Sequence, residues 1–589
     1  MKLDVNTVLP WLNRNSEYKN RQESYSPLNS TIGLCARRGE QGIGELYLNY
    51  NRASRAVWNR LADFKAAFNQ NDSDFCCLVF GEGAEKAECA FYAADSFLIE
   101  STLPVTLFAE NSDKLVNFWK TEKAENMLLY HGYCLNCDDR DPDETVPIGV
   151  GVSVKNGVIE STEKELRILP QNGRVTVAFA MEALEIDEER LKKNVQSAPD
   201  RIKEAKALCE AWVRNMLRDL ELDLPTETEA KLAARAIGGL LQNLAEAQGN
   251  LRGYISSFPN RGTYPTHFLW DSCFQNLAYE VMNPALAADS MLCLAATQRA
   301  DGKYGQFNCS TWSRPHYTQP ALVGWAALRL AKQTGDKEFI RTMLPSLEKN
   351  NRWWLSQRMT PCGLICCPHG LETGQDDSPR FDNGTTISVD MNSYLLSQMR
   401  AAAELARMID EPEKADYWQQ KADAFAALMV ELLYDEEAGL FFDLMPDTME
   451  RVTIVASSDL LPLWAGVPLS KEKTDGMIRK YLLNPAHLFG DIPFPSIGYG
   501  ESCYEAASWW RGPTWLPIAR LMLELLINHG YEEQAREASL RLYRMLVKDG
   551  ELHELFNSQT GEGLGSVEQG WSCAIFIRLC RDLYEKNKD

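Results

Sequence analysis

Four acidic side chains lie close together in LETGQDDSPRFDNG, residues 371–384: Glu372, Asp376, Asp377 and Asp382. Glycines and a proline interrupt the run. Carboxylates crowded into one loop repel one another unless a metal, a bound cation or a proton-transfer reaction uses them, or water solvates them. Neighbouring carboxylates and partial burial also raise the pKa of a carboxyl group, which a proton donor working near neutral pH needs.

Three further segments combine aromatic residues and glycines with acids or an arginine: FPNRGTYPTHFLWDSCFQN (258–276), ASWWRGPTW (507–515) and LHELFNSQTGEGLGSVEQGWS (552–572). Carboxylates and arginine bind hydroxyl groups, while indole faces stack on the apolar faces of sugars. A pair of carboxyl groups can also cleave a glycosidic bond, because one protonates the leaving oxygen and the other activates water. These segments therefore favour a sugar site with glycosidase chemistry.

The elements that must position these segments are helical. From Pro225 onward apolar residues recur at helical spacing, and Thr226 with the acids after it suits a helix start. The short polar turns QTGDKEF, IDEPEKADY and NHGYEEQ join amphipathic helices in pairs. We count about a dozen helical segments, the number that a closed toroid of six α-hairpins needs. The absence of a fixed repeat argues against an open solenoid, and an irregular bundle remains the other alternative.

Strand patterns precede the helices. Residues from about 25 to 185 contain short runs rich in Val, Phe, Tyr and Leu, several of which alternate apolar with polar residues. We predict a mostly α protein, an (α/α)6 toroid preceded by an N-terminal antiparallel β-sandwich domain. The predicted divisions are the sandwich at 1–185, a helical linker at 186–224 with a break near Pro199, and the catalytic barrel at 225–589.

Composition narrows the function classes. Hydrophobic residues at 45% and charged residues at 24% are typical of a globular protein. The net charge of −21 argues against a nucleic-acid partner, which requires clustered Lys and Arg. No run of about 18 apolar residues predicts a membrane helix. We expect a small carbohydrate as the partner; the oligomeric state stays open.

The cysteines and the start of the chain predict the compartment. The first residues, MKLDVNTVLPWLNRNSEYKN, lack the apolar core of a secretory signal, so the sixteen cysteines are expected to be reduced thiols in a cytoplasm. CLNC (Cys134, Cys137) is a lone C-x-x-C, and CGLICCPH (362–369) has irregular spacing for structural zinc. We interpret both as free thiols.

Four motifs, which occur along the chain in the family's order, resemble those of glycoside hydrolase family 63, and more distantly the trehalases of family 37. LETGQDDSPRFD is similar to the family's E-S-G-x-D-x-S-P-R-[FW]-D segment, with Thr373 in the usual serine place. FLWDS and WWRGPTW match its W-D-S and W-R-G-P-x-W elements. HELFNSQTGEG is similar to its E-x-[YF]-N-P-x-T-G segment, with Ser558 where proline is usual. The resemblance implies an α/α toroid and an inverting glycosidase.

The resemblance also implies the catalytic pair, Asp376 as general acid and Glu554 as general base. Glu551, Glu562 and Glu568 are close enough in sequence to compete for the second role. In an inverting enzyme the two carboxyl groups are ~6.5–9.5 Å apart, which leaves room for one water.

Seven further residues are expected to bind the substrate: Trp270, Asp271, Gln319, Glu372, Trp510, Arg511 and Trp515. Asp271 would accept hydrogen bonds from sugar hydroxyl groups, and Glu372 would contact the sugar and act as a charged neighbour of Asp376. Alternatives remain for the others, because the tryptophans can also pack the toroid and Arg511 can hold acidic residues instead of sugar. Asp377 and Asp382 are expected to hold the loop, with Arg380 as an internal counter-charge.

The substrate is where the sequence departs from the family pattern. The family often has a tryptophan directly before its acidic segment, and here that position is Leu371. The leading prediction is an exo-acting inverting α-glycosidase, most simply an α-glucosidase acting on a short α-glucoside. The alternative is hydrolysis of glucosylglycerate or mannosylglycerate, whose carboxylate four nearby residues could bind: Arg261, Tyr264, Arg314 and His316.

Two other function classes remain. A sugar epimerase would share the toroid and use histidines as acid and base, of which four lie in or near these loops: His267, His316, His369 and His553. A carbohydrate-binding toroid without catalysis is the second alternative, since a fold does not fix function. The glycosidase chemistry requires no metal or organic cofactor, although the acidic loops leave room for a structural calcium ion.

Overall fold

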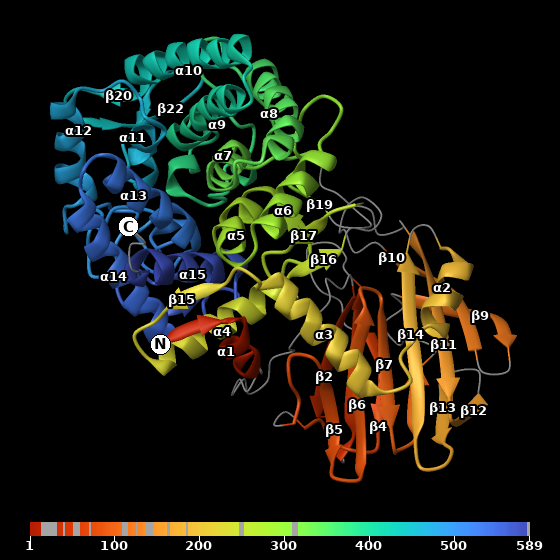
Figure 1. Cartoon of the computed structure of the whole chain (residues 1–589). Helices are drawn as coiled ribbons and strands as arrows, with labels where there is room; N and C mark the ends of the chain where they lie inside the picture. The colour runs from red at the N-terminus through yellow and green to blue at the C-terminus, as the bar shows by residue number, and fades with distance from the viewer. Residues whose placement is uncertain are drawn as a thin grey trace.

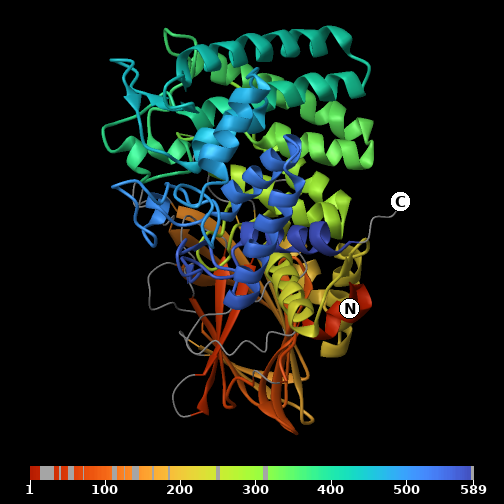
Figure 2. The same ribbon diagram turned by 90° about the vertical axis from the view of Figure 1, so that its left-hand side faces the viewer.

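The computed structural model describes most of the chain, and the statements below concern only those residues. They are 1–12, 32–38, 42–50, 59–69, 72–108, 116–124, 127–135, 145–161, 165–183, 186–246, 253–308 and 316–585. Helices gather in one part of the molecule and two layers of strands in the other (Figures 1 and 2). Among the described residues, no helix combines the length and the apolar character that crossing a bilayer would require.

The strands form two antiparallel sheets that face each other. In spatial order, the larger sheet contains β5 (Leu78–Glu82), β6 (Glu85–Ala93), β7 (Ser96–Ser101), β14 (Val175–Ala183), β11 (Thr145–Lys155), β10 (Met127–Leu135) and β9 (Val116–Ala124). The smaller sheet contains β12 (Gly157–Ser161), β13 (Glu165–Pro170), β8 (Val105–Phe108), β4 (Asn59–Phe64), β3 (Gly44–Tyr50) and β2 (Ile32–Arg38). Phe64 of β4 and Phe80 of β5 meet at 4.3 Å between ring centroids, inside a buried apolar cluster that both sheets supply.

The first residues belong with the helical part and not with these sheets. β1 (Lys2–Asp4) pairs antiparallel with β15 (Glu221–Asp223), and the short helices α1 (Val5–Val8) and η1 (Leu9–Trp11) follow. Leu3, Val8 and Leu12 are buried in the core that the helices share. Among the described residues, the strands of the two large sheets therefore begin at β2. Strand patterns in the sequence could not show that the first twelve residues belong to the helical part.

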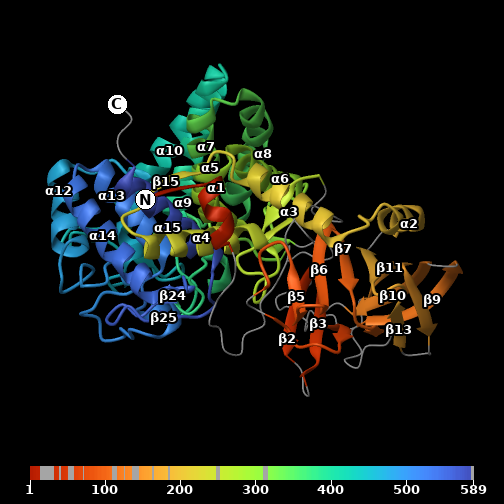
Figure 3. The same cartoon turned by 60° about the horizontal axis from the view of Figure 1, so that its bottom comes forward.

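Two helices connect the sheets to the helical part (Figures 1 and 3). α2 (Glu188–Gln196) and α3 (Ile202–Met216) are separated at Pro199, as the sequence predicted. Leu191 and Val195 of α2 and Ile202 of α3 pack on the outer face of the larger sheet. The apolar stripe of each helix thus covers a sheet face that would otherwise be exposed.

Six helices contact one another in a closed ring: α5 (Leu269–Met282), α7 (Val323–Thr334), α9 (Val389–Met408), α11 (Leu461–Ala465), α13 (Leu516–Asn528) and α15 (Gly570–Tyr584). Each packs against the next, and α15 packs against α5. Five helices pack outside them: α4 (Glu227–Gln242), α6 (Pro284–Ala296), α8 (Lys337–Gln357), α10 (Pro412–Leu433) and α14 (Glu532–Asp549). α12 (Lys471–Met477) lies at the periphery (Figure 1).

The predicted helix boundaries have identifiable causes. Gly335 ends α7 at a φ of 65° and Gly530 follows α13 at a φ of 81°, so both occupy the left-handed region that a side chain disfavours. Asp336 then caps α8 by accepting hydrogen bonds from two backbone amides. Thr226 stands at the predicted start of α4, but its hydroxyl donates to Glu229 and makes no hydrogen bond with the backbone.

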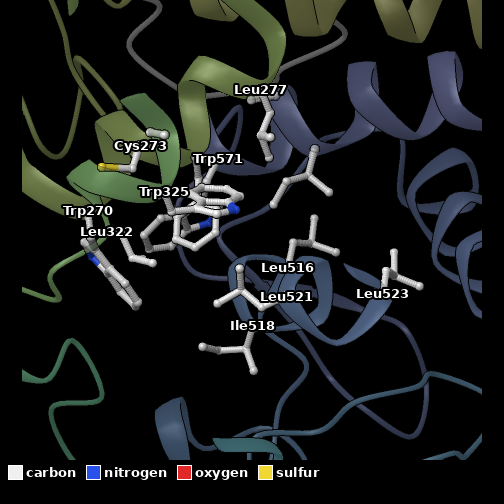
Figure 4. Packing of buried hydrophobic residues seen from close by; sticks show 14 of the residues in the cluster. Trp270, Cys273, Leu277, Leu322, Trp325, Leu516, Ile518, Leu521, Leu523 and Trp571 are labelled. Carbon is white, nitrogen blue, oxygen red and sulfur yellow. The ribbon is translucent and has the colours of Figure 1, made fainter. Parts of the chain in front are cut away.

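The ring is filled by aromatic and aliphatic side chains. Trp270 and Trp571 contact each other at 5.9 Å between ring centroids, beside Trp325 (Figure 4). Leu516 and Leu521 of α13 approach from the other side (Figure 4). Because Trp270 directly precedes Asp271, this packing fixes the start of α5 and with it an acidic side chain.

Short two-stranded ribbons complete the described elements: β16 (Leu244–Glu246) with β17 (Ile255–Ser257), β18 (His267–Phe268) with β19 (Phe307–Asn308), β20 (Tyr434–Asp435) with β21 (Leu440–Phe441), β22 (Asp443–Leu444) with β23 (Arg451–Val452), and β24 (Leu555–Phe556) with β25 (Gly563–Leu564). They lie in the long connections that lead into the ring helices. These connections carry the four motif segments.

Candidate active site

Hydrogen bonds join the motif segments that precede different ring helices. Asn260 donates a hydrogen bond from Nδ2 to the carbonyl of Val567 at 2.6 Å, which joins the segment before α5 to the one before α15. Thr514 and Phe556 exchange backbone hydrogen bonds of 2.9 and 3.0 Å, which joins the segments before α13 and α15. Residues that are hundreds of positions apart in sequence therefore share one site.

Glu554 is a buried carboxyl group inside this site. The Ser566 amide donates to Glu554 Oε2 at 3.0 Å, and Tyr264 is also hydrogen-bonded to the carboxylate. Burial raises the pKa of Glu554 above its ordinary value, while these hydrogen bonds partly offset the shift because they favour the charged form. Gly565 has a φ of 76°, and a Cβ there would lie 2.7 Å from Glu554 Oε2, so this glycine makes room for the carboxylate.

Asp271 lies in the first turn of α5 and is buried near the same group. Burial raises its pKa well above the ordinary value, and the charges of Glu554 and Asp376 add to the shift. Tyr264 also interacts electrostatically with Glu554, Asp271 and Asp376. The structure thus brings the two predicted catalytic carboxyl groups and the predicted sugar-binding aspartate around one tyrosine.

Asp376 is exposed, unlike the buried Asp271 and Glu554, and Asp377 beside it is exposed as well. Gln375 before it and Ser378 after it are buried, and the Ser378 amide donates to the Gln375 carbonyl at 3.1 Å. Thr373 makes the turn that the family serine would make, since its hydroxyl accepts from the Gln375 amide at 3.1 Å and donates to the Gly370 carbonyl at 2.7 Å. The change from serine to threonine therefore keeps the function of the hydroxyl.

Glu372 is fully buried and is held by two cations. Arg358 donates from Nε and Nη2 to the two carboxylate oxygens at 3.1 and 2.9 Å, and Lys303 Nζ lies 4.0 Å from Oε1. The Thr318 amide donates to Oε1 at 3.3 Å. This arrangement favours a structural role over the predicted contact with sugar, which stays a prediction.

The prediction that Arg380 is the internal counter-charge of the acidic loop was wrong. Arg380 is buried and pairs with Asp390 and Asp443, at 2.6 and 3.0 Å. Asp382 pairs instead with Arg511, whose Nη1 and Nη2 donate to its two carboxylate oxygens at 2.9 and 2.8 Å. The sequence neighbour is turned inward, so an arginine from a distant segment takes its place.

Arg511 therefore holds the acidic loop, which is the alternative that the sequence had left open. Its Nη1 also donates to the Asp377 carbonyl at 3.1 Å, and the Trp510 amide donates to Asp377 Oδ1 at 2.9 Å. The WWRGPTW segment is thus fastened to the loop that carries Asp376. A direct contact between Arg511 and sugar stays a prediction.

The three predicted sugar-binding tryptophans are buried and contact one another. Trp510 and Trp515 are stacked with 3.9 Å between ring centroids and 4° between planes. The ring centroids of Trp270 and Trp510 are 6.0 Å apart, and a Cβ on Gly374 would approach the Trp270 ring to 2.7 Å. These contacts favour packing for Trp510 and Trp515, whose stacking on a sugar stays a prediction.

Gln319 is buried, and its Oε1 accepts from the Trp270 amide at 3.2 Å. It therefore holds the start of α5, whether or not it also touches substrate. Near Leu371, which is half-buried, the rings of His369 and Tyr317 lie 5.1 Å apart, and the Leu371 amide donates to His369. These rings are the aromatic groups found beside the position of the family tryptophan.

Ser558, the second departure from the family pattern, makes bonds that proline could not. Its amide donates to the Ala506 carbonyl at 3.3 Å and its hydroxyl donates to the Gly512 carbonyl at 2.8 Å. Sequence reasoning gave no role to Ser558, Arg358 or Ser566. Polar residues of these types occur throughout the chain, and no pattern along the sequence marks those that reach the site.

The residues considered for glycerate and for epimerase chemistry have different environments. Arg261 is buried, and its Nε and Nη2 donate to the carbonyls of Gln242 and Leu244 at 2.7 and 2.6 Å. His316 is exposed, and Arg314 lies outside the described residues. Burial lowers the pKa of His267 to about 4, which leaves its ring neutral near pH 7.

His553 is the remaining histidine of this group, and its Nδ1 lies 2.8 Å from Asp549. In the described part of the chain, no three His, Cys, Asp or Glu side chains gather in an arrangement that could hold a metal ion. Cys137 and the side chain of Cys134 lie outside the described residues.

The carboxyl groups and their helical frame are compatible with a glycoside hydrolase, and the comparisons with known proteins show that class and its family. The chain belongs to the family of the mannosylglycerate hydrolase MGH1-like glycoside hydrolase domain, whose model matches residues 264–572, just over half of the chain. The two large antiparallel sheets lie outside the matched residues.

Its relatives include mannosylglycerate hydrolases and trehalases. Over 429 residues the chain is 25% identical to mannosylglycerate hydrolase MGH2 of Selaginella moellendorffii, covering 59% of this chain and 86% of that one. A probable trehalase of Eremothecium gossypii is 25% identical over 190 residues, 30% of this chain and 26% of the relative.

A solved structure resembles the fold. The GH63 mannosylglycerate hydrolase of Thermus thermophilus in complex with glucose has a TM-score of 0.52 at 22% identity, covering 59% of this chain and 99% of that one. The helical catalytic domain of this chain is therefore similar to a family 63 structure, and the antiparallel sheets precede it.

Proposed function

We propose that the protein is an exo-acting, inverting α-glycosidase with Asp376 as general acid and Glu554 as general base, built on a closed (α/α)6 toroid. One observation carries the proposal. Asp271, Asp376 and Glu554 come from three distant segments, yet all three interact electrostatically with Tyr264. Carboxylates that lie close together repel one another, so their proximity needs a reason. Glycosidic cleavage supplies one, because it requires two carboxyl groups across one sugar ring.

In the proposed reaction the Asp376 carboxyl gives its proton to the glycosidic oxygen as the bond from the anomeric carbon to that oxygen breaks. Water attacks the anomeric carbon from the opposite face and loses a proton to the Glu554 carboxylate. Tyr264 and Ser566 support this role, because their hydrogen bonds favour the charged form of Glu554. We expect ~6.5–9.5 Å between the two carboxyl groups.

Asp271 would bind the sugar itself. Burial raises the pKa of Asp271, and its carboxyl oxygens can accept hydrogen bonds from the hydroxyl groups of a glycosyl unit. The close packing of Trp270 against Gly374 supports a rigid surface beside Asp271. A rigid surface favours substrates that present one terminal sugar.

For the substrate we propose a hexosyl unit α-linked to a small aglycone, with mannosylglycerate and glucosylglycerate as the first candidates. The names of the relatives support this choice, since the Selaginella protein is a mannosylglycerate hydrolase. A neutral α-glucoside is the second candidate. The engagement of Arg261 with backbone carbonyls favours it, because Nε and Nη2 already donate to protein groups.

The conditions of action are part of the proposal. We propose catalysis without a metal or organic cofactor, with a structural calcium ion as the one open addition, and action in a cytoplasm. The thirteen cysteines whose side chains are described are free thiols, which supports a reducing compartment. The predicted domain divisions at 1–185, 186–224 and 225–589 are proposed with it.

The test is a substrate panel followed by NMR of the released sugar. It contains mannosylglycerate, glucosylglycerate, trehalose and α-linked glucobioses. Initial release of the β-anomer is expected from an α-linked substrate, and initial release of the α-anomer would refute inversion. Asp376→Asn and Glu554→Gln should each lower turnover ~10²-fold or more with the fold intact. Turnover that survives both changes would overturn the assignment of the pair.

A further inference from the structure

A buried polar network lies directly beneath the loop that carries Asp376. We call it the Arg380 network; its members are Gln375, Arg380, Asp390, Asp443 and Ser458. Each is at most 1% exposed. They come from the acidic loop, the first turn of α9, β22 and the 3-10 helix η6 (Ser457–Leu460). Buried groups of this kind are retained at a cost unless each finds a partner, so their arrangement is informative.

Gln375 is the member that directly precedes Asp376 in the chain. Its Nε2 donates to Asp390 Oδ2 and to Ser458 Oγ, both at 2.9 Å. Its Oε1 accepts from Arg380 Nη2 at 3.2 Å. Only an amide can donate twice and accept at once in this volume, so a carboxylate or an apolar side chain of the same size would leave partners unpaired.

Asp443 fixes the rest of the network. Both of its oxygens accept from Arg380 Nη1, at 3.1 and 3.0 Å, and Oδ1 also accepts from the Val389 amide at 2.8 Å. Thr386 donates to Oδ2 at 3.0 Å. The guanidinium that holds Gln375 is therefore itself held by Asp443 of β22, which the segment leading into α9 fixes in turn.

The chain around Asp376 is thus tied down on both sides. On one side, Gln375, the residue before Asp376, is anchored in the Arg380 network. On the other side, Asp377 is held by the Trp510 amide and by Arg511. Asp376 itself is exposed at the turn between these anchors. A carboxyl group in this position has its direction set by its neighbours, and an error of about 1 Å in such a group can cost ~10²-fold in rate.

We propose that Gln375 is a positioning residue that directs the Asp376 carboxyl at the glycosidic oxygen through the Arg380 network. This inference rests on the proposed function. The proton from Asp376 matters most when the leaving group departs as a basic alkoxide. It matters little when fluoride departs, because fluoride is stable without a proton. Loss of positioning should therefore slow alkyl α-glycosides selectively and spare α-glycosyl fluorides.

The test compares two variants that each remove one buried amide. Gln375→Met keeps the size of the side chain and removes its hydrogen bonds. Gln398→Met is the matched control, since Gln398 is also buried and donates from Nε2 to the side-chain oxygens of Asn350 and Asn351 at 2.9 Å, away from the acidic loop. The readout is kcat/KM for methyl α-mannoside or α-glucoside, divided by kcat/KM for the corresponding α-glycosyl fluoride.

Gln375→Met should lower this ratio by ~10-fold or more, within the ~10²–10⁴-fold that a general acid supplies. Gln398→Met should leave the ratio at the wild-type value, even if both rates fall. An unchanged ratio in Gln375→Met would overturn the inference, because a merely structural loss slows both substrates alike. Should Gln375→Met fail to fold, Ser458→Ala removes only one partner and must lower the ratio in the same direction.

Asp376→Asn, measured alongside, separates the two hypotheses. If it lowers the ratio strongly and Gln375→Met and Ser458→Ala do not, the general acid is assigned and the positioning role is refuted. If Asp376→Asn itself leaves the ratio unchanged, the proposed function fails and the inference fails with it.

Discussion

The contact between Gly374 and Trp270 gives a quantitative prediction for Gly374→Ala. Gly374 has a φ of 74°, and a Cβ there would lie 2.7 Å from Trp270 Cζ2 and 2.9 Å from Cη2. Carbon atoms prefer ~3.5–4.0 Å, so the ring would have to retreat by roughly 0.8 Å or more. It cannot retreat freely, because Phe274, Trp510 and Trp571 surround it.

Two costs add in this variant. A left-handed backbone costs an L-residue ~1–2 kcal/mol, and overpacking a tight site costs ~1–3 kcal/mol. We expect Gly374→Ala to lower the free energy of unfolding of the helical part by ~2–5 kcal/mol. If the loop moves instead to relieve the contact, Asp376 moves with it, and kcat should fall ~10²-fold with a smaller loss of stability.

Gly335→Ala is the matched control for this experiment. Gly335 has a φ of 65° at the end of α7, and the place that a Cβ would take there has no neighbouring atom within 4 Å, so this variant carries the backbone cost alone. We expect a loss of ~1–2 kcal/mol and unchanged kcat. Urea unfolding followed by tryptophan fluorescence suits both variants, since eleven of the fifteen tryptophans lie between residues 270 and 571. Equal losses in the two variants, or wild-type stability and rate in Gly374→Ala, would refute the reasoning.

Three further predictions concern charges around the site. Burial raises the pKa of Glu554, and a base must be deprotonated to act, so the acidic limb of kcat/KM against pH should lie above the ~4.3 of an exposed glutamate. Tyr264→Phe should move that limb to higher pH, because the hydrogen bond from Tyr264 lowers the pKa of Glu554. A limb that moves to lower pH in this variant would contradict the prediction. Arg358→Met should destabilise the fold by ~3–5 kcal/mol in urea unfolding, because Glu372 is left buried without its partner, and adding Glu372→Gln should restore part of the loss. Arg511→Lys should change stability by less than ~1 kcal/mol, because Asp382 is exposed, yet lower kcat by loosening the acidic loop; equal kcat in variant and wild type would argue against that anchoring role.

The motif residues show how far sequence reasoning reaches. Residue types and spacing indicated segments suited to glycosidic cleavage, and the resemblance to family 63 then implied Asp271, Asp376 and Glu554 within them. Their mutual proximity, through Tyr264, follows from the closure of the helix ring. Tyr264 was considered only as one of four residues that could bind a glycerate carboxylate, and its hydrogen bond to Glu554 connects segments almost three hundred residues apart.

The partners of the charged residues could not be predicted in the same way. Arg380 is two residues from Asp382 in the chain, yet it pairs with Asp390 and Asp443, while Arg511 reaches Asp382 from 129 positions away. An ion pair depends on which side chain is turned inward, and that choice is made by packing over the whole domain. Ser566 and Arg358 were missed for the same reason.

The sequence by itself determined the alternation of strand and helix patterns and the helix ends at Gly335 and Gly530, because periodicity and backbone preference are local properties. It also determined the identity of the acidic segments, since residue types are read directly from it. Tertiary structure alone decided that Glu372 is neutralised by Arg358, that Trp510 stacks on Trp515, and that Gln375 is anchored beneath Asp376. These relations depend on distances between segments far apart in the chain. Hydrogen bonds and dispersion contacts fall off within a few ångströms, so only the closed ring of helices could fix them.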